Sequence, residues 1–398
     1  MTHAFIYDAL RTPRGRGKAG GGLYEVKPID LLSNVMEALR LRNDLDTGAV
    51  EDLIVATGEP VGEQGQNIAK TAITYCGWDQ RVCGAQIHRY CAGGLDAVNL
   101  AASKVMSGME QLVVAGGVES MSRIGIGQGG AAQGDPWVSF KTYGISQGLA
   151  ADIVANLEGF SREQLDNYAL LSQQRAAKAI SQGWLKSIVP VKDFNGIPIL
   201  AVDELPRPTT AETLAKLQPA FKLFNDYGHG DVARLRYPQL QSIDNRHTAG
   251  SSSGVVDGAS LVMVGNEAIG SQLGLSPRAR IISFALTGTE PTIMLNGPVP
   301  ATQKALLKAG LELDDIDLFE VNEAFSAVVL RYQKLLNIPD EKINVNGGAI
   351  AYGHPIGATG AMLVGTLLDE LERRDLKRGL VSLCAGGGIG IATIIERL

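Results

Sequence analysis

Hydrophobic and polar residues follow two periods along the chain, one typical of buried strands and one typical of amphipathic helices. Short apolar runs at 4–10, 111–117 and 379–387 predict strands. Apolar positions between 95 and 105 recur at helical spacing, and Gly108 ends that predicted helix. Strands that alternate with helices favour layered α/β units around a buried, largely parallel sheet.

The order of these elements occurs twice. Residues 49–58 (AVEDLIVATG) resemble residues 314–323 (DDIDLFEVNE), an offset of 265, which is 314 minus 49. At that offset Cys91 falls beside Gly357, and both positions lie in glycine-rich turns that lead into a helix and then a strand. Matched features in one order predict two related halves.

The first half is longer because the pattern changes between about 119 and 250. Strand signals become rare there, and residues 161–184 predict a helix with Ser161 as its N-cap and Glu163 in its first turn. A polar, loop-rich segment follows. Such an insertion either binds a ligand on a rigid scaffold or is a surface excursion with its own small core, and the pattern leaves both open.

Composition narrows the class of protein. The 398 residues are enough for two domains or one large compound domain, and 45% apolar with 20% charged residues is an ordinary soluble composition. A net charge of −6 argues against a nucleic-acid partner, and no apolar run is long enough to span a membrane. The N-terminus lacks the order of a signal peptide, and the four cysteines lack metal-ligand spacing. We therefore expect a bacterial, cytoplasmic protein with reduced thiols and no metal.

Cys91 is the first candidate for chemistry because it lies at or just before a helix N-terminus. The helix dipole and free N–H groups there favour a thiolate, and lowering its pKa by about two units corresponds to roughly 2.7 kcal/mol. Gly94 would let a substrate approach closely. Asp96 and Asn99 would take the more polar side of the helix. The alternative is a small buried residue in a tight turn.

Three further residues lie at strand ends or helix starts. His354, between a glycine and a proline, could be a base for Cys91 or a packing histidine. Cys384 precedes three glycines whose N–H groups could bind an oxyanion, although a buried thiol fits equally. Asn322 follows a strand and could also be a helix cap. The repeat would place the turns of Cys91 and His354 face to face across a pseudo-twofold axis.

One tempting motif fails. Residues 15–20 (GRGKAG) match the spacing of a dinucleotide-binding loop, but no helix follows them.

These stretches, in this order, resemble the thiolase family of acyl-CoA C-acyltransferases over nearly the whole chain. The matching motifs are RTPRGRGKAGGGL, HRYCAGG, AGGVESMS, TAGSSSGVVDGA, VNEAF, GGAIAYGHPIGATGA and CAGGGIG. The resemblance implies two βαβαβαββ halves in a five-layer α/β/α/β/α thiolase-like fold with an inserted loop domain. It divides the chain into a first half of residues 1–118 with 251–270, a loop domain of 119–250 for CoA and acyl binding, and a second half of 271–398.

The resemblance also implies roles. Cys91 would attack the 3-keto carbon of a 3-ketoacyl-CoA and hold the acyl group as a thioester, after His354 takes its proton. Cys384 would protonate the leaving acetyl-CoA enolate and then deprotonate CoA. His354 and a water held by Asn322 would form one oxyanion hole, and the N–H groups of Cys91 and Gly386 the other.

The resemblance further implies coenzyme A as a co-substrate, with no permanently bound cofactor. Ser253 and Ala249 match positions that contact the pantetheine arm. Arg207 would contact the nucleotide phosphates, although a gap blurs the alignment there and a solvated surface charge is the alternative. The partners implied are acyl-CoA and CoA, and a second copy of the chain in a homodimer or homotetramer.

Some positions depart from the family pattern. His88 stands where the family usually has Asn, and the segment 224–247 is longer than the family minimum. Residues 146–152 (SQGLAAD) replace a His-Met-Gly-type stretch that shapes the acyl pocket, so Gln147 puts short-chain specificity in doubt.

We therefore expect an acetyl-CoA C-acyltransferase that cleaves a 3-ketoacyl-CoA degradatively, with a longer fatty or ring-derived acyl group. The alternatives are synthesis of acetoacetyl-CoA from two acetyl-CoA, a ketoacyl synthase, which Cys384 argues against, and a non-catalytic acyl-CoA- or lipid-binding relative.

Overall fold

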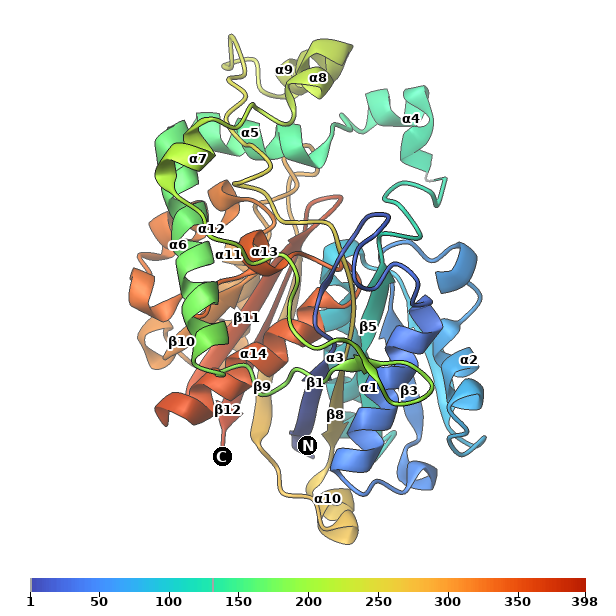
Figure 1. Ribbon diagram of the computed structural model, residues 1–398. Coiled ribbons are helices and arrows are strands. Elements are labelled where there is room, and N and C mark those ends of the chain that lie inside the picture. The colour runs from blue at the N-terminus through green and yellow to red at the C-terminus, as the bar shows by residue number, and fades with distance from the viewer. Residues whose placement is uncertain (1, 131) are drawn as a thin grey trace.

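The computed structural model describes residues 2–130 and 132–398 and has the expected layered α/β fold (Figure 1). The strands of the first half are β1 (Ala4–Arg11), β2 (Gly15–Arg16), β3 (Asp52–Ala56), β4 (Cys83–Ile87), β5 (Leu112–Ser120) and β8 (Val256–Gly265). Those of the second half are β9 (Ala279–Gly288), β10 (Leu318–Val321), β11 (Arg378–Ala385) and β12 (Ile389–Arg397). Between β5 and β8 lies the short pair β6 (Val191–Lys192) and β7 (Pro198–Leu200).

The helices follow the same division. Those of the first half are α1 (Pro28–Arg42), α2 (Ile68–Tyr75), α3 (Gly93–Ser107) and α10 (Glu267–Leu273). The insertion carries α4 (Pro136–Lys141), α5 (Gln147–Glu158), α6 (Arg162–Ser181), α7 (Ala211–Ala215), α8 (Lys222–Phe224) and α9 (Gly230–Arg236). The second half has α11 (Pro298–Ala309), α12 (Ser326–Leu336), α13 (Ala349–Tyr352) and α14 (Thr359–Arg374). None of the helices in the described residues is long and apolar enough to cross a bilayer.

The two halves share one strand order, β4-β3-β5-β8-β1 in the first and β10-β11-β12-β9 in the second. A parallel bridge from Ile343 to Phe319 takes the place of β4 beside β10. In both halves the pairs toward the outer edge of the sheet are parallel, and the two pairs nearest the other half are antiparallel. Antiparallel pairing of β1 with β9 joins the halves.

The expectation of a largely parallel sheet is wrong, because the sheet contains both parallel and antiparallel pairs. Residues 386–388 link β11 to β12, and three residues are too few for the crossover that parallel neighbours need. β5 and β8 form the matching antiparallel pair in the first half. There the inserted segment takes the place of the short turn, since the chain leaves β5 at Ser120 and returns at Val256.

Helices α3 and α14 lie side by side at the centre and pack into one apolar core with strands of both halves (Figure 1). A second core covers the outer face of the first half with α1 and α2, and a third covers the second half with α11 and α12. A Cβ at Gly94 would lie 2.6 Å from the Gly357 carbonyl oxygen, so glycine is needed where the central helices begin. The prediction of a polar side for α3 is wrong, because Asp96 and Asn99 are buried in this central layer.

The insertion packs on the second half and shares its core. The predicted helix at 161–184 is confirmed as α6, where Ser161 forms a capping box with Gln164. Tyr168 and Ser172 of α6 donate hydrogen bonds of 2.8 and 2.7 Å to the Glu323 carboxylate. Apolar residues of α5 join residues of loop 293–295 and Cys384 in one cluster. The insertion therefore lies against the end of β11 and does not form a separate body.

Candidate active site

Cys91 lies in a one-turn 3-10 helix, Tyr90–Ala92, between β4 and α3. Its position just before the central helix is the one predicted from the sequence. The side chain is buried, with 6% exposed. Tyr90 has φ of +47°, a left-handed conformation that a bulky residue adopts at a cost of about 1–3 kcal/mol. The turn that presents the thiol is therefore held by the surrounding structure.

Hydrogen bonding from the Cys91 N–H, from the Gln147 side chain and from the Gly386 N–H acts to lower the pKa of Cys91. Burial outweighs these hydrogen bonds and raises the pKa of Cys91 to about 11. The expectation of a resting thiolate is therefore wrong, because the helix dipole and these donors do not offset removal of the thiol from water. The thiol needs a base at the moment of reaction.

Cys384 ends β11 beside this site. It is fully buried, and burial together with the nearby Cys91 raises its pKa above the usual range. The glycine turn follows it, with Gly387 and Gly388 at φ of +74° and +81°. A Cβ at Gly386 would lie 3.4 Å from the Tyr90 ring, so this turn packs directly on the residue before Cys91.

His354 lies between α13 and α14, and its N–H donates to the Gly254 carbonyl at 2.8 Å. Its Nδ1 is 2.6 Å from the Thr359 hydroxyl, which itself donates to the Pro355 carbonyl at 2.9 Å. Nδ1 must therefore carry the proton, and Nε2 is an acceptor. Burial, and then the charge of Arg14, lower the pKa of His354 to about 3. The imidazole is neutral and ready to act as a base at Nε2.

Asn322 follows β10, and its N–H donates to the Ser382 carbonyl at 3.0 Å. Its Nδ2 lies 3.4 Å from His354 Nε2, and because that nitrogen is an acceptor, Nδ2 is the donor. The Asn322 Oδ1 is buried without a hydrogen-bond partner in the described residues. A buried oxygen in this state fits the bound water that the family resemblance implies here.

Glu119, near the end of β5, joins the two halves at the site and was missed by the sequence reasoning. Its carboxylate accepts from the N–H of Gly58, from the N–H of Gly357 at 2.7 Å and from Gln64 Nε2 at 2.6 Å. Gly357 is three residues after His354, so Glu119 positions the His354 turn against the first half. A glutamate directly after a run of small and apolar residues was the available signal.

The other predicted positions lie between α6 and β8. Ser253 is half-buried and donates its N–H to the Ala324 carbonyl at 3.0 Å, and Ala249 is exposed. Arg207 is exposed, and its N–H donates to Gln173 Oε1 at 3.3 Å. Their contacts with CoA stay predictions. His88 is exposed and packs edge-on against Tyr90 at 4.7 Å.

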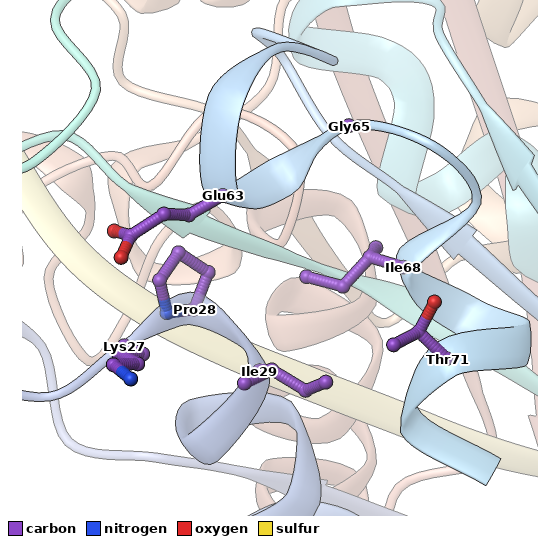
Figure 2. A pocket seen from close by; sticks show the side chains of 7 residues that line it. All are labelled: Lys27, Pro28, Ile29, Glu63, Gly65, Ile68 and Thr71. Carbon is purple, nitrogen blue, oxygen red and sulfur yellow. The ribbon is translucent and has the colours of Figure 1, made fainter. Parts of the chain in front are cut away.

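A cavity of about 220 Å³ lies between the start of α1 and the start of α2 (Figure 2). Its lining includes Lys27, Glu63 and Ile68 and none of the four predicted catalytic residues. It belongs to the outer layer of the first half.

Known proteins match the whole chain. Residues 4–228 match the family model "Thiolase, N-terminal domain" and residues 275–397 match "Thiolase, C-terminal domain". The chain is 39% identical over 406 residues to a protein named 3-ketoacyl-CoA thiolase from Aliivibrio fischeri, with 100% of both covered. It is 37% identical to a protein named steroid 3-ketoacyl-CoA thiolase from Mycobacterium tuberculosis, covering 100% of this chain and 95% of the relative. The crystal structure of the Bacillus anthracis acetyl-CoA acetyltransferase superposes with a TM-score of 0.86 at 35% identity, covering 100% of this chain and 99% of that one.

Proposed function

Because this chain belongs to the thiolase family, whose members use CoA as a substrate, and is an acyl-CoA thiolase, we propose that it works degradatively through an acyl thioester on Cys91. The observation that carries the proposal is the packing of the Gly386 turn, which directly follows the buried Cys384, against Tyr90 next to the buried Cys91. Breaking a carbon–carbon bond needs a nucleophile, a fixed oxyanion site and a proton donor for the carbanion, and these groups supply all three.

In the first half-reaction, Nε2 of His354 takes the Cys91 proton as the sulfur attacks C3 of the 3-ketoacyl-CoA. The S–C3 bond forms, and the carbonyl electrons move onto oxygen. The N–H groups of Cys91 and Gly386 bind that oxyanion, and each such donor contributes about 3–4 kcal/mol in comparable sites. The concerted proton transfer follows from the burial of Cys91, which leaves no resting thiolate.

Collapse of the oxyanion breaks the C2–C3 bond and leaves the electron pair on C2 as the enolate of acetyl-CoA. His354, which now carries the proton on Nε2, and the water at Asn322 Oδ1 stabilise the enolate oxygen. The Cys384 thiol gives its proton to C2. Acetyl-CoA leaves, and the acyl group remains on Cys91.

In the second half-reaction, the Cys384 thiolate takes the proton of incoming CoA. The CoA sulfur attacks the thioester, and the S–C bond to Cys91 breaks. The sulfur of Cys91 recovers its proton from His354, and acyl-CoA leaves. Every group returns to its starting protonation state.

The CoA chain would enter along the inserted segment. Ser253 and Ala249 would contact the pantetheine arm and Arg207 the phosphates. Arg207→Gln should raise the KM for CoA and leave kcat unchanged if that contact exists. Glu341→Gln, at an exposed position on the second half, is the control. We further propose a homodimer or homotetramer, which sedimentation velocity would resolve.

The experiment is thiolysis of acetoacetyl-CoA and 3-ketooctanoyl-CoA, followed by loss of enolate absorbance. Cys91→Ala should abolish cleavage, and intact-mass spectrometry should find the acyl adduct in wild type alone. Cleavage by the variant at the wild-type rate would overturn the assignment of Cys91. A ring-bearing 3-ketoacyl-CoA tests the wider acyl group, which Gln147 and the relative named for steroid substrates support.

Synthesis of acetoacetyl-CoA is the second candidate function, since the matched crystal structure is named acetyl-CoA acetyltransferase. The free energy of thioester exchange favours cleavage. The ratio of cleavage to condensation rates at equal substrate concentration distinguishes the two candidates.

A further inference from the structure

The loop between β9 and α11, residues 289–297, is attached to the glycine turn that follows Cys384. The Thr289 N–H and hydroxyl donate hydrogen bonds of 2.6 and 2.9 Å to the Gly388 carbonyl. A Cβ at Gly388 would lie 2.6 Å from the Thr289 carbonyl oxygen, so the two backbones are in close contact. Because Gly386 of the same turn belongs to the proposed oxyanion hole, loop 289–297 lies beside the place where the acyl carbonyl would bind.

Loop 289–297 also contributes to the apolar surroundings of the second thiol. One buried cluster contains Cys384, residues of α5 and three consecutive residues of the loop, Ile293, Met294 and Leu295. Met294 has φ of +36°, a conformation that a side chain of this size adopts only where the surrounding structure holds it. An acyl chain that extends from the oxyanion hole needs an apolar surface, and this cluster offers one.

Glu290 holds the loop from within. Its Oε1 accepts a hydrogen bond of 3.0 Å from the Thr292 N–H, and its Oε2 accepts one of 3.0 Å from the Ile293 N–H. Its main-chain carbonyl accepts the Met294 N–H at 3.2 Å. The Glu290 side chain therefore closes the turn that places Met294.

The Glu290 carboxylate has a further partner in the segment 224–247, which departs from the family pattern. The Tyr237 hydroxyl, directly after α9, donates a hydrogen bond to Glu290 Oε2. Burial and then this hydrogen bond raise the pKa of Tyr237, so the hydroxyl keeps its proton and is the donor. Arg236 Nε lies 3.5 Å from Glu290 Oε1, but an ion pair of a half-exposed arginine contributes little. Ala233 of α9 is fully buried in the Cys384 cluster, so the segment packs on the site as well.

We propose that Tyr237 and Glu290 are positioning residues for acyl-group specificity: through their hydrogen bond the segment 224–247 fixes loop 289–297 beside Cys384, and an acyl chain longer than acetyl packs on that loop. The inference rests on the proposed function. Cleavage of acetoacetyl-CoA leaves an acetyl group, which ends one carbon beyond its carbonyl and does not need the loop. Cleavage of 3-ketooctanoyl-CoA leaves a hexanoyl group, which does.

The test compares these two substrates in Tyr237→Phe, which keeps the ring and removes only the hydroxyl. The kcat/KM for 3-ketooctanoyl-CoA should fall about tenfold, because the loop loses a hydrogen bond to a charged group, and kcat/KM for acetoacetyl-CoA should stay at the wild-type value. Tyr227→Phe, at an exposed position in the same segment, is the matched control. Glu290→Gln should shift the ratio in the same direction, and it covers the case in which the phenylalanine variant does not fold.

The ratio of the two kcat/KM values is the readout, since a general loss of structure lowers both alike. An unchanged ratio in both variants would overturn the proposal, because the pair would then only stabilise the fold. Calorimetric titration of hexanoyl-CoA and acetyl-CoA into Cys91→Ala, with and without Tyr237→Phe, measures the same preference without turnover. Tyr237→Phe should weaken binding of hexanoyl-CoA alone. Absence of cleavage by the wild type would refute the proposed function, and the binding ratio would still decide on Tyr237.

Discussion

Replacement of Glu119 tests whether one buried carboxylate holds the two halves in register at the active site. Burial raises the pKa of Glu119, and hydrogen bonds from Gln64, Gly58 and Gly357 oppose that rise. All of these partners are donors, so the site is built for an acceptor. Glutamine has the same shape but offers one acceptor oxygen and one NH₂ donor.

The expected loss of stability follows from counting the hydrogen bonds that each replacement of Glu119 removes. In the better orientation of Glu119→Gln, the remaining oxygen keeps Gly58 and Gly357, and the NH₂ faces Gln64 Nε2. Gln64 cannot turn its amide to compensate, because its Oε1 accepts from the Ser120 N–H at 2.6 Å. Two hydrogen bonds are then lost, the one from Gln64 Nε2 and the longer one of 3.3 Å from the Glu59 N–H, a destabilisation of about 1.5–3 kcal/mol. Glu119→Ala removes the acceptor of all four donors and should cost about 3 kcal/mol or more.

Urea unfolding measures the stability of both variants, with Glu341→Gln as an exposed control. The turnover number should fall in both Glu119 variants, because the turn at Gly357 carries His354. It is measured under conditions in which each variant is still fully folded. A free energy of unfolding for Glu119→Gln within about 0.5 kcal/mol of wild type would refute the reasoning. So would a glutamine variant that is less stable than the alanine variant.

Three further predictions concern the catalytic groups. The neutral imidazole of His354 is the form that accepts a proton, and with a pKa lowered to about 3 it protonates only as the pH falls toward that value. The single-turnover acylation rate should therefore stay constant from pH 8 to pH 5, and an acid limb near pH 6.5 that His354→Asn removes would contradict this. Thr359→Val removes the acceptor for His354 Nδ1–H and should lower kcat about tenfold or more, whereas Thr359→Ser should retain activity, and equal rates would contradict the assigned tautomer. Cys384→Ala should slow thiolysis about 10²–10⁴-fold while Cys91 remains open to alkylation, and a smaller loss would argue against Cys384 as the proton donor.

The fold could be predicted from the sequence where the local hydrophobic pattern and the internal repeat agreed. Residues 49–58 and 314–323 correspond to β3 and β10, which take the same place in the two strand orders. The direction of the last strands could not be read from hydrophobic pattern, because a buried strand looks the same in parallel and antiparallel pairing. The three-residue link between β11 and β12 was the usable signal, since it is too short for a crossover.

In the candidate site, too, local sequence predicts some features and not others. Helical spacing placed Cys91 at the start of α3, and local sequence suffices for that. The sign of its pKa shift depends on burial in the folded chain, which outweighs the hydrogen bonding from Gln147 and Gly386. The burial of Asp96 and Asn99 has the same origin, because α3 is covered on both sides. Glu119 acts through contacts with residues distant in sequence, which no local pattern encodes.

The repeat explains why the chain carries one nucleophile although it carries two copies of the turn. Residues 88–94 (HRYCAGG) align with 354–360 (HPIGATG) at an offset of 266, which is 354 minus 88, so Gly357 occupies the place of Cys91. A Cβ at Gly357 would lie 2.6 Å from the Ala56 carbonyl oxygen, and the Gly357 N–H is already held by Glu119. A thiol therefore cannot stand in the second copy without moving β3. The second copy instead buries its histidine, His354, whereas the first copy leaves His88 exposed, and this asymmetry divides nucleophile and base between the halves.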